Sequence, residues 1–337
     1  MTHAAGILPC QSLEDLMADG GIRAATLFDA DQVQPASLDL RLGVRAWRVR
    51  ASFLPRAGAT VLGRTADVAM HQIDLTGGAV LERGCVYIVE LQEHLRLPVD
   101  VSARANPKSS TGRVDVFVRL LTDGQPAFDD IRAGYDGPLY LEIAPQTFSI
   151  LVRAGTRLSQ LRLKRGAPQV LRVQDVAVDL TRDIVGYRAR RHCGVIDLDR
   201  EDAHDPRDFW EPLTARGGEL LLDPGEFYIL ASREGIDIAA DHAAEMSAID
   251  PAVGEFRVHY AGFFDPGFGA AEAGGQGSRG VLEMRSHETP FLLEDGQTVA
   301  RLVFEPLTER PSRLYGAGGS HYQRQGLRLS KHFGPWV

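Results

Sequence analysis

A short polar segment carries the residues best suited to binding a charged ligand. Residues Asn106–Arg113 read Asn-Pro-Lys-Ser-Ser-Thr-Gly-Arg. Ser109 and Ser110 can each donate a hydroxyl hydrogen bond. Lys108 and Arg113 can bring positive charge to the same small volume. These are the groups that a polyphosphate needs, so the segment predicts a phosphate-binding loop. A polar turn that only leads into a strand is the alternative.

The composition limits what such a ligand could be. The 337 residues are 44% hydrophobic and carry a net charge of −8. The apolar fraction is enough for a packed core. The negative charge argues against general nucleic-acid binding, which favours a basic surface. An anionic ligand therefore needs a local basic pocket, and Lys108 with Arg113 is the candidate.

The sequence also predicts the cellular location of the protein. Its three cysteines, Cys10, Cys85 and Cys193, are far apart and odd in number, so we expect reduced thiols and no disulfide framework. The first nine residues lack the pattern of a signal peptide. No stretch approaches 18 consecutive apolar residues, so no membrane span is expected. Together these features predict a cytoplasmic protein without a membrane partner.

The elements that must position the loop are mostly strands. Ser12 followed by Asp15 predicts the start of a short helix that ends at Gly20-Gly21. Runs that alternate with a period of two follow, separated by Gly, Pro, Asp and Asn turns. They cover Ser37–Gly43, Val44–Val49, Val86–Leu91, Val114–Leu121, Leu139–Ile143 and Phe148–Val152. Many short strands at this spacing predict a mainly β chain, as a barrel or sandwich.

The chain also repeats itself at a separation of 141 to 143 residues. Three segments of the first copy have counterparts in the same order in the second: Leu81–Val89 with Leu222–Leu230, Leu139–Glu142 with Gly280–Glu283, and Phe148–Leu161 with Phe291–Leu302. A period this long indicates two copies of a whole domain. We predict domains at 1–168 and 169–337, joined within Lys164–Asp179.

These motifs occur in a recognisable order. Ser37–Gly43, Lys108–Arg113 and Gly134–Glu142 resemble the motif series of the dCTP deaminase and dUTPase superfamily. In the second copy, Gly254–Phe268 resembles the third-motif hairpin. Gly296–Leu307, Tyr315 and Gly319–Gly326 resemble the fourth motif and the nucleotide-covering tail. The chain is most similar to the long, tandem form of dCTP deaminase. The resemblance implies two dUTPase-like distorted, jelly-roll-like β-barrels.

The Leu-Glu at the end of each hairpin resembles the deaminase branch, which converts dCTP to dUTP and ammonia. The resemblance implies that a glutamate moves protons between water and the cytosine ring, and Glu142 and Glu283 are the candidates. A glutamate in a surface ion pair on the outer face of a strand is the structural alternative. Arg113 and a serine, Ser109, would position the water.

Zinc is not expected, although many cytidine deaminases use it to activate water. The chain has no Cys-x-x-Cys, and the adjacent pair His192-Cys193 does not have the spacing of a zinc site. Mg²⁺ is expected with the triphosphate, held largely by phosphate oxygens and water.

The resemblance also implies which residues bind the nucleotide. Lys108, Ser109 and Ser110 would hold phosphates, although the family has an arginine where Lys108 stands. Arg113 would lie near the base. The remaining positions are Asp265 in the second-copy hairpin, with Tyr315 and Gln325 in the tail, where His321 replaces a more usual lysine.

The two copies differ in opposite places, and two arrangements of the site stay open. The first hairpin has Arg132-Ala133 where the second has Asp265-Pro266, so its aspartate is missing or has moved to Asp129 or Asp130. The second copy has no serine pair or arginine near Met246–Ala252, the segment that matches the loop. Either the loop of copy one meets the hairpin of copy two, and Glu283 does the chemistry, or first copies alone build the site around Glu142.

The superfamily forms trimers, so we expect a homo-oligomer, a trimer or a multiple of it. Two other functions compete with deamination. Asp265 stands where dUTPases orient their water, which predicts a dUTPase or a bifunctional enzyme that forms dUMP. A non-catalytic nucleotide-binding β-trimer is the third possibility.

Overall fold

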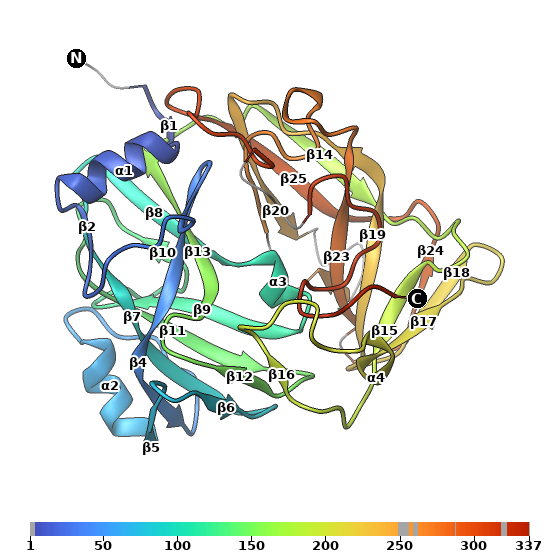
Figure 1. Cartoon of the computed structure of the whole chain (residues 1–337), viewed down its shortest axis with the longest axis horizontal. Helices are drawn as coiled ribbons and strands as arrows, with labels where there is room; N and C mark the ends of the chain where they lie inside the picture. Colours follow the sequence, from blue (N-terminus) through green and yellow to red (C-terminus); the bar gives the residue numbers. More distant parts are fainter. Residues whose placement is uncertain (1–3, 249–255, 259–261, 287, 318–321, 337) are drawn as a thin grey trace.

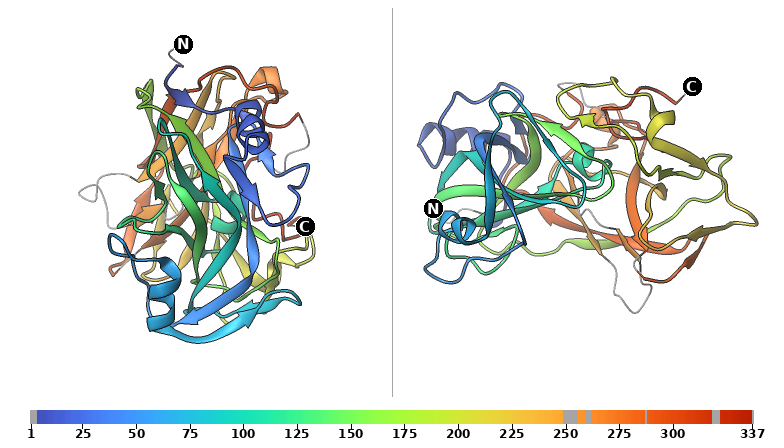
Figure 2. Two further views of the ribbon diagram at one scale, coloured as in Figure 1. Left: turned by 90° about the vertical axis from the view of Figure 1, so that its left-hand side faces the viewer. Right: turned by 90° about the horizontal axis from the view of Figure 1, so that it is seen from below.

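The computed structural model describes residues 4–248, 256–258, 262–286, 288–317 and 322–336 (Figure 1). Two halves rich in strands lie side by side, the first blue to green and the second yellow to red. The view from below in Figure 2 separates the same two halves. The prediction of a mainly β chain is confirmed.

The first half is a barrel-like sheet with the strand order β10-β8-β13-β4-β7-β11-β9, to which β1, β2, β3 and β5 add at the margins. Its strands are β1 Gly6–Ile7, β2 Ile22–Ala24, β3 Val33–Gln34, β4 Ser37–Val49, β5 Ala69–Asp74, β7 Val86–Arg96, β8 Val101–Pro107, β9 Val116–Thr122, β10 Asp130–Ile131, β11 Asp136–Pro145 and β13 Arg157–Arg165. The alternating Leu38, Leu40 and Leu42 of β4 are all buried in its core, which is the reason for the period of two.

The two predicted strands around Gly43 form one continuous strand, β4. The pairing of β4 with β7 shifts register between Leu42 and Ala46. A Cβ atom on Gly43 would lie 2.8 Å from the backbone oxygen of Glu90, so the glycine allows close approach at this irregularity and does not end the strand.

The second half contains a sheet in the order β14-β25-β20-β22, a sheet in the order β17-β15-β19-β23-β21 and the pair β18-β24. Its strands are β14 Arg172–Ala177, β15 Gly186–Ala189, β17 Trp210–Leu213, β18 Glu219–Leu222, β19 Phe227–Ile236, β20 His242–Ala248, β21 Phe256–Val258, β22 Phe263–Phe264, β23 Ser278–Ser286, β24 Phe291–Glu294 and β25 Thr298–Pro306. The chain leaves the first sheet at Arg165 and enters the second at Arg172.

The halves are also joined by a crossing strand and by their core. β16 Ile196–Asp197, which follows the join, pairs in parallel with β12 Ile150–Val152, and β12 pairs with β6 Ala79–Leu81. Phe148 of the first half packs edge-on against Phe209 and Trp210 of the second, with ring centroids 5.7 and 5.4 Å away. The two halves therefore share one hydrophobic cluster.

The helices are short: α1 Cys10–Ala18, α2 Val61–Val68, α3 Ser109–Gly112, α4 Pro206–Phe209 and the 3-10 turn η2 Ala271–Ala273. The prediction that Ser12 caps the first helix is wrong, because α1 begins at Cys10 after Pro9. The Ser12 hydroxyl instead donates to Glu309 Oε1 at 3.0 Å. None of the helices in the described part of the chain is long and apolar enough to span a membrane.

Strand β23 faces both halves at once. Leu282 and Met284 belong to the core cluster of the second half, whereas Val281 belongs to the cluster shared with the first. Because successive side chains on a strand point to opposite faces, Glu283 points the same way as Val281, toward the first half.

Candidate active site

The predicted phosphate loop is a single helical turn between two strands of the first half. Pro107 ends β8, and Lys108 has an extended conformation before α3. The Lys108 backbone carbonyl accepts from the amides of Thr111 and Gly112, at 2.9 and 3.0 Å. In Figure 1 this turn lies between the two halves of the molecule, so its side chains can reach groups of the second half.

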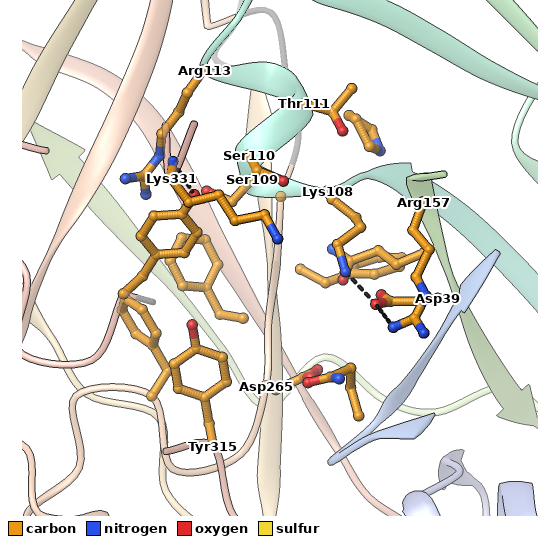
Figure 3. Close-up of a pocket in the computed structure, with 18 of the residues that line it drawn as sticks. Asp39, Lys108, Ser109, Ser110, Thr111, Arg113, Arg157, Asp265, Tyr315 and Lys331 are labelled. Atoms are coloured by element: carbon orange, nitrogen blue, oxygen red, sulfur yellow. Dashed lines mark hydrogen bonds and ion pairs between the residues drawn. The ribbon is translucent and has the colours of Figure 1, made fainter. Parts of the chain in front are cut away.

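A cavity of about 690 Å³ opens between the halves at this turn. Residues of both copies line it, and they include eight of the predicted site residues: Lys108, Ser109, Ser110, Arg113, Asp265, Glu283, Tyr315 and Gln325. Figure 3 shows the loop on one side of the cavity, with Asp265 and Tyr315 on the other. Within one chain, the loop of copy one thus meets the hairpin and tail of copy two.

The end of the cavity at β23 holds a buried carboxyl group, that of Glu283, next to a buried cation, Arg113. Arg113 Nε lies 3.9 Å from Glu283 Oε1, and their side chains are 2% and 6% exposed. Arg113 Nε has no hydrogen-bond partner among the described residues. Burial raises the pKa of Glu283 to about 7, although the charge of Arg113 acts to lower it. A carboxyl with this pKa can both accept and return a proton near neutral pH.

The C-terminal tail holds Arg113 from the other side. The Arg113 guanidinium lies 4.0 Å from the ring centroid of Tyr322. It donates to Gln325 Oε1 and to the Arg328 carbonyl, both at 3.0 Å. The Gln325 amide in turn donates to the Arg279 carbonyl of β23 at 2.8 Å. The tail therefore connects the loop of copy one to the strand that carries Glu283.

Tyr315 forms a wall of the cavity. Its ring packs against Phe268 with the centroids 5.4 Å apart, and its backbone amide donates to the Pro266 carbonyl at 2.8 Å. His321, which the sequence placed at a family lysine position, lies outside the described residues.

The opposite end of the cavity holds cations paired with carboxylates. Lys108 Nζ donates to Asp39, and Arg157 Nη1 lies 3.7 Å from the same carboxylate. Arg157 also forms an ion pair with Asp31 at 2.8 Å, and this hydrogen bond lowers the pKa of Asp31. Figure 3 shows Lys108 and Arg157 converging on Asp39.

Arg157 was missed by the sequence analysis, although it lies within the repeated segment Phe148–Leu161. Two arginines in that segment are four residues apart. Arg153 pairs with Asp197 at 2.8 Å, whereas Arg157 lines the cavity. Arg157 begins β13, whose antiparallel pairing with β4 sets it opposite Arg41, whereas Arg153 directly follows β12. Tyr322 was missed too, because its role depends on how the tail folds back.

Asp265 is buried, and each of its carboxylate oxygens accepts a hydrogen bond. Its Oδ1 accepts from Arg162 at 2.9 Å, and its Oδ2 accepts from the Ser37 hydroxyl at 3.3 Å. Burial raises the pKa of Asp265 despite the nearby charge of Arg162. The Ser37–Gly43 motif of copy one thus supports the hairpin of copy two.

Glu142 does not line the cavity. It lies on β11 directly opposite Arg119 of β9, with which it forms an ion pair, and it is 1% exposed. In the first hairpin, Asp129 Oδ1 accepts from the Leu120 amide at 2.7 Å, and burial raises the pKa of Asp129 to about 7. Of the second-copy segment Met246–Ala252, Met246 lines the cavity, and residues 249–252 lie outside the described part.

No group of three or more His, Cys, Asp or Glu side chains that could hold a metal ion occurs among the described residues. At the end of the cavity that holds Lys108, the carboxylate of Asp39 is paired with that lysine. A divalent ion in this cavity would therefore take most of its ligands from phosphate and water.

The fold defines a mainly β protein of two halves, with a cavity lined by residues of both. Comparison with known proteins agrees. A model of the 2'-deoxycytidine 5'-triphosphate deaminase (DCD) N-terminal domain matches residues 4–167, and a model of the C-terminal domain matches residues 157–333. The chain is an enzyme that belongs to the 2'-deoxycytidine 5'-triphosphate deaminase family, which confirms the resemblance seen in the sequence.

A solved structure and two curated relatives illustrate the similarity. The crystal structure of 2'-deoxycytidine 5'-triphosphate deaminase from Agrobacterium tumefaciens is 53% identical, covers 90% of this chain and 99% of its own, and superposes with a TM-score of 0.86. The dCTP deaminase of Halorubrum lacusprofundi is 30% identical over 158 residues, 46% of this chain and 75% of that protein. The dUMP-forming dCTP deaminase of Halobacterium salinarum is 31% identical over 163 residues, 46% of this chain and 77% of that protein.

Proposed function

We propose that the protein deaminates dCTP to dUTP and ammonia in the cavity between its repeats, with Glu283 as the proton shuttle. The observation that carries this proposal is the buried pair of Glu283 and Arg113, at the end of the cavity away from the cations Lys108 and Arg157. A cytosine placed at Glu283 would direct its triphosphate toward those cations.

The chemistry needs one water and one residue that moves protons. Arg113 Nε, which has no hydrogen-bond partner among the described residues, would hold the water beside Glu283. The Glu283 carboxylate takes a proton from the water as the oxygen bonds to C4 of cytosine, and it returns that proton to N3. A second proton passes from the new hydroxyl to the amino group as the C4–N bond breaks. The products are ammonia and uracil with a C4 carbonyl, so the atoms balance.

The other residues bind the nucleotide in this proposal. Lys108, Ser109 and Ser110 contact the phosphates, together with Arg157, and the phosphates replace Asp39 as the partner of Lys108. Asp265 lies at the sugar, while Tyr315 and Gln325 cover the nucleotide. Mg²⁺ would enter with the triphosphate and reduce the repulsion between the phosphates and Asp39.

The product is dUMP only if the enzyme also hydrolyses dUTP to dUMP and pyrophosphate. The dUMP-forming relatives keep the second reaction open, but both carboxylate oxygens of Asp265 are already hydrogen-bonded, to Arg162 and to Ser37. An aspartate engaged in this way is poorly placed to orient a water at a phosphate. We therefore expect dUTP.

The product assay tests the proposal directly. Purified protein is incubated with dCTP and Mg²⁺, and ammonia, dUTP, dUMP and pyrophosphate are measured over time. Ammonia and dUTP in equal amounts are expected. Pyrophosphate with dUMP would show the bifunctional reaction, and tight dCTP binding without ammonia would show a non-catalytic nucleotide-binding protein. Activity that is lost on chelation and restored by zinc alone would contradict the zinc-free mechanism.

The activity should depend on pH through Glu283. The carboxylate form accepts the proton, and burial raises the pKa of Glu283 to about 7. We expect kcat/KM to be level above that pH and to fall about tenfold per pH unit below it. The measurement is kcat/KM from about pH 5 to about pH 9 at constant ionic strength. A profile that stays level down to about pH 5 would exclude a shuttle with this pKa.

The homo-oligomeric state, a trimer or a multiple of it, and the cytoplasmic location stay predictions. The three cysteines are free thiols, as a reducing compartment would keep them.

A further inference from the structure

A second charged contact between the halves lies next to the Arg113–Glu283 pair. Arg285 of β23 forms an ion pair with Asp115, which directly precedes β9. The Asp115 side chain is 1% exposed and that of Arg285 is 18% exposed. The Thr147 hydroxyl donates to the same Asp115 oxygen at 2.5 Å, and Arg285 also contacts that hydroxyl at 3.0 Å. The contact is therefore a partly buried network, with the Asp115 carboxylate buried and Arg285 half-buried.

The backbone holds Asp115 in an unusual conformation. Its φ angle is +54°, in the left-handed region that residues other than glycine rarely adopt. Two backbone hydrogen bonds fix it there: the Asp115 amide donates to the Gly112 carbonyl at 2.9 Å, and the Gln146 amide donates to the Asp115 carbonyl at 2.9 Å. This conformation links the end of the phosphate loop to the start of β9 and directs the carboxylate toward the second half.

The two interdomain pairs run in parallel. Arg113 ends the loop and Asp115 lies two residues further along the chain, and their partners Glu283 and Arg285 are two residues apart on β23. Side chains at this spacing on a strand point to the same face. A contact that holds Asp115 against Arg285 would therefore restrain the spacing of Arg113 and Glu283, whose Nε and Oε1 atoms are 3.9 Å apart.

We propose that Asp115 and Arg285 form an interdomain clamp, which positions the Arg113 guanidinium against the Glu283 carboxylate for the reaction. They are positioning residues, because neither is among the residues that line the cavity. The clamp rests on the proposed function, in which Glu283 moves the proton.

The test compares Asp115→Asn and Arg285→Met with wild type in the dCTP assay. Each variant is expected to lower kcat at least about tenfold with KM changed less than about threefold, since small misplacements of reacting groups are costly. Because Arg113 is the charge that lowers the pKa of Glu283, a looser pair should shift the acid limb of the pH profile upward. The double variant should be no slower than the slower single variant, and Arg285→Lys should recover part of the rate.

A matched control separates positioning from general packing of the halves. Lys164 and Glu305 form another interdomain ion pair, at 2.6 Å with exposures of 19% and 12%, away from the cavity lining. Glu305→Gln should leave kcat and the pH profile unchanged. The clamp is refuted if Asp115→Asn and Arg285→Met retain wild-type kcat, or if Glu305→Gln loses as much. Should Asp115→Asn not fold, Arg285→Met and Arg285→Lys decide alone.

Failure of the clamp and failure of the proposed function give different results. If Glu283→Gln stays active, the shuttle is wrong, and the clamp loses its purpose. If Glu283→Gln is inactive while the clamp variants behave as wild type, only the clamp is wrong.

Discussion

Replacing Glu283 by glutamine is expected to lower kcat for dCTP by on the order of 10²–10⁴-fold, with the nucleotide still bound. Glutamine keeps the size and polarity of the side chain but cannot accept a proton from water. The Arg113 contact and the phosphate end of the cavity are unchanged, so the binding of dCTP should stay close to that of wild type. Ammonia release gives kcat, and equilibrium binding of dCTP gives the affinity.

Glu142→Gln is the matched control, because it changes the equivalent residue of the other repeat. Glu142 pairs with Arg119 and is absent from the cavity lining, so dCTP turnover should change little. If instead Glu142→Gln is inactive and Glu283→Gln is not, the site is built from first copies. Unfolding would not explain a loss in Glu283→Gln. At pH 8 the Glu283 carboxyl of the wild type is mostly ionised in the folded and in the unfolded state. Burying that charge lowers the free energy of unfolding, and a neutral glutamine avoids this cost.

Replacing Arg113 by methionine is expected to lower kcat at least about 10²-fold and to raise KM as well. The variant loses the donor that would hold the water and the cation beside Glu283. It also loses the hydrogen bond to Gln325 and the stacking on Tyr322, so the tail should cover the nucleotide less well. Arg113→Lys should restore little, because an ammonium cannot supply the fixed fork of donors. Steady-state kinetics with dCTP measure both constants.

Arg328→Met provides the control for this experiment. Arg328 also lies near the Tyr322 ring, at 5.9 Å, but its side chain is exposed and it contacts Arg113 through its backbone carbonyl. Its loss should change kcat less than about threefold. Equal losses in the two variants would mean that Arg113 acts only by packing the tail.

The sequence predicted which loop residues lie together at the cavity, but it could not choose between the two glutamates, and the reason is physical. Lys108, Ser109, Ser110 and Arg113 are close in the chain, so local spacing already places them together. The repeat identified Glu142 and Glu283 as equivalent, but choosing between them requires knowing which strand faces the loop. That depends on how the two halves pack, which no local pattern records.

The fold shows the same division. The strand patterns were recognisable because burial on one face imposes a period of two, as in Leu38, Leu40 and Leu42. The helix starts at Cys10, after Pro9, and the Ser12 hydroxyl donates to Glu309 in a distant segment. The return of β16 to the first half, and the role of Arg157, depend equally on partners far along the chain.

Arg113 of the loop and Glu283 lie on one polypeptide. The effective concentration of one side of the cavity at the other is therefore set by the chain that links them. For tethered groups this effective concentration is of the order of millimolar, about a thousandfold above that of a typical micromolar enzyme solution. Dilution cannot separate Arg113 from Glu283, as it could if separate subunits supplied them. Duplication also frees each repeat to change: Glu142 pairs with Arg119 in one copy, while the buried carboxyl of Glu283 lines the cavity in the other.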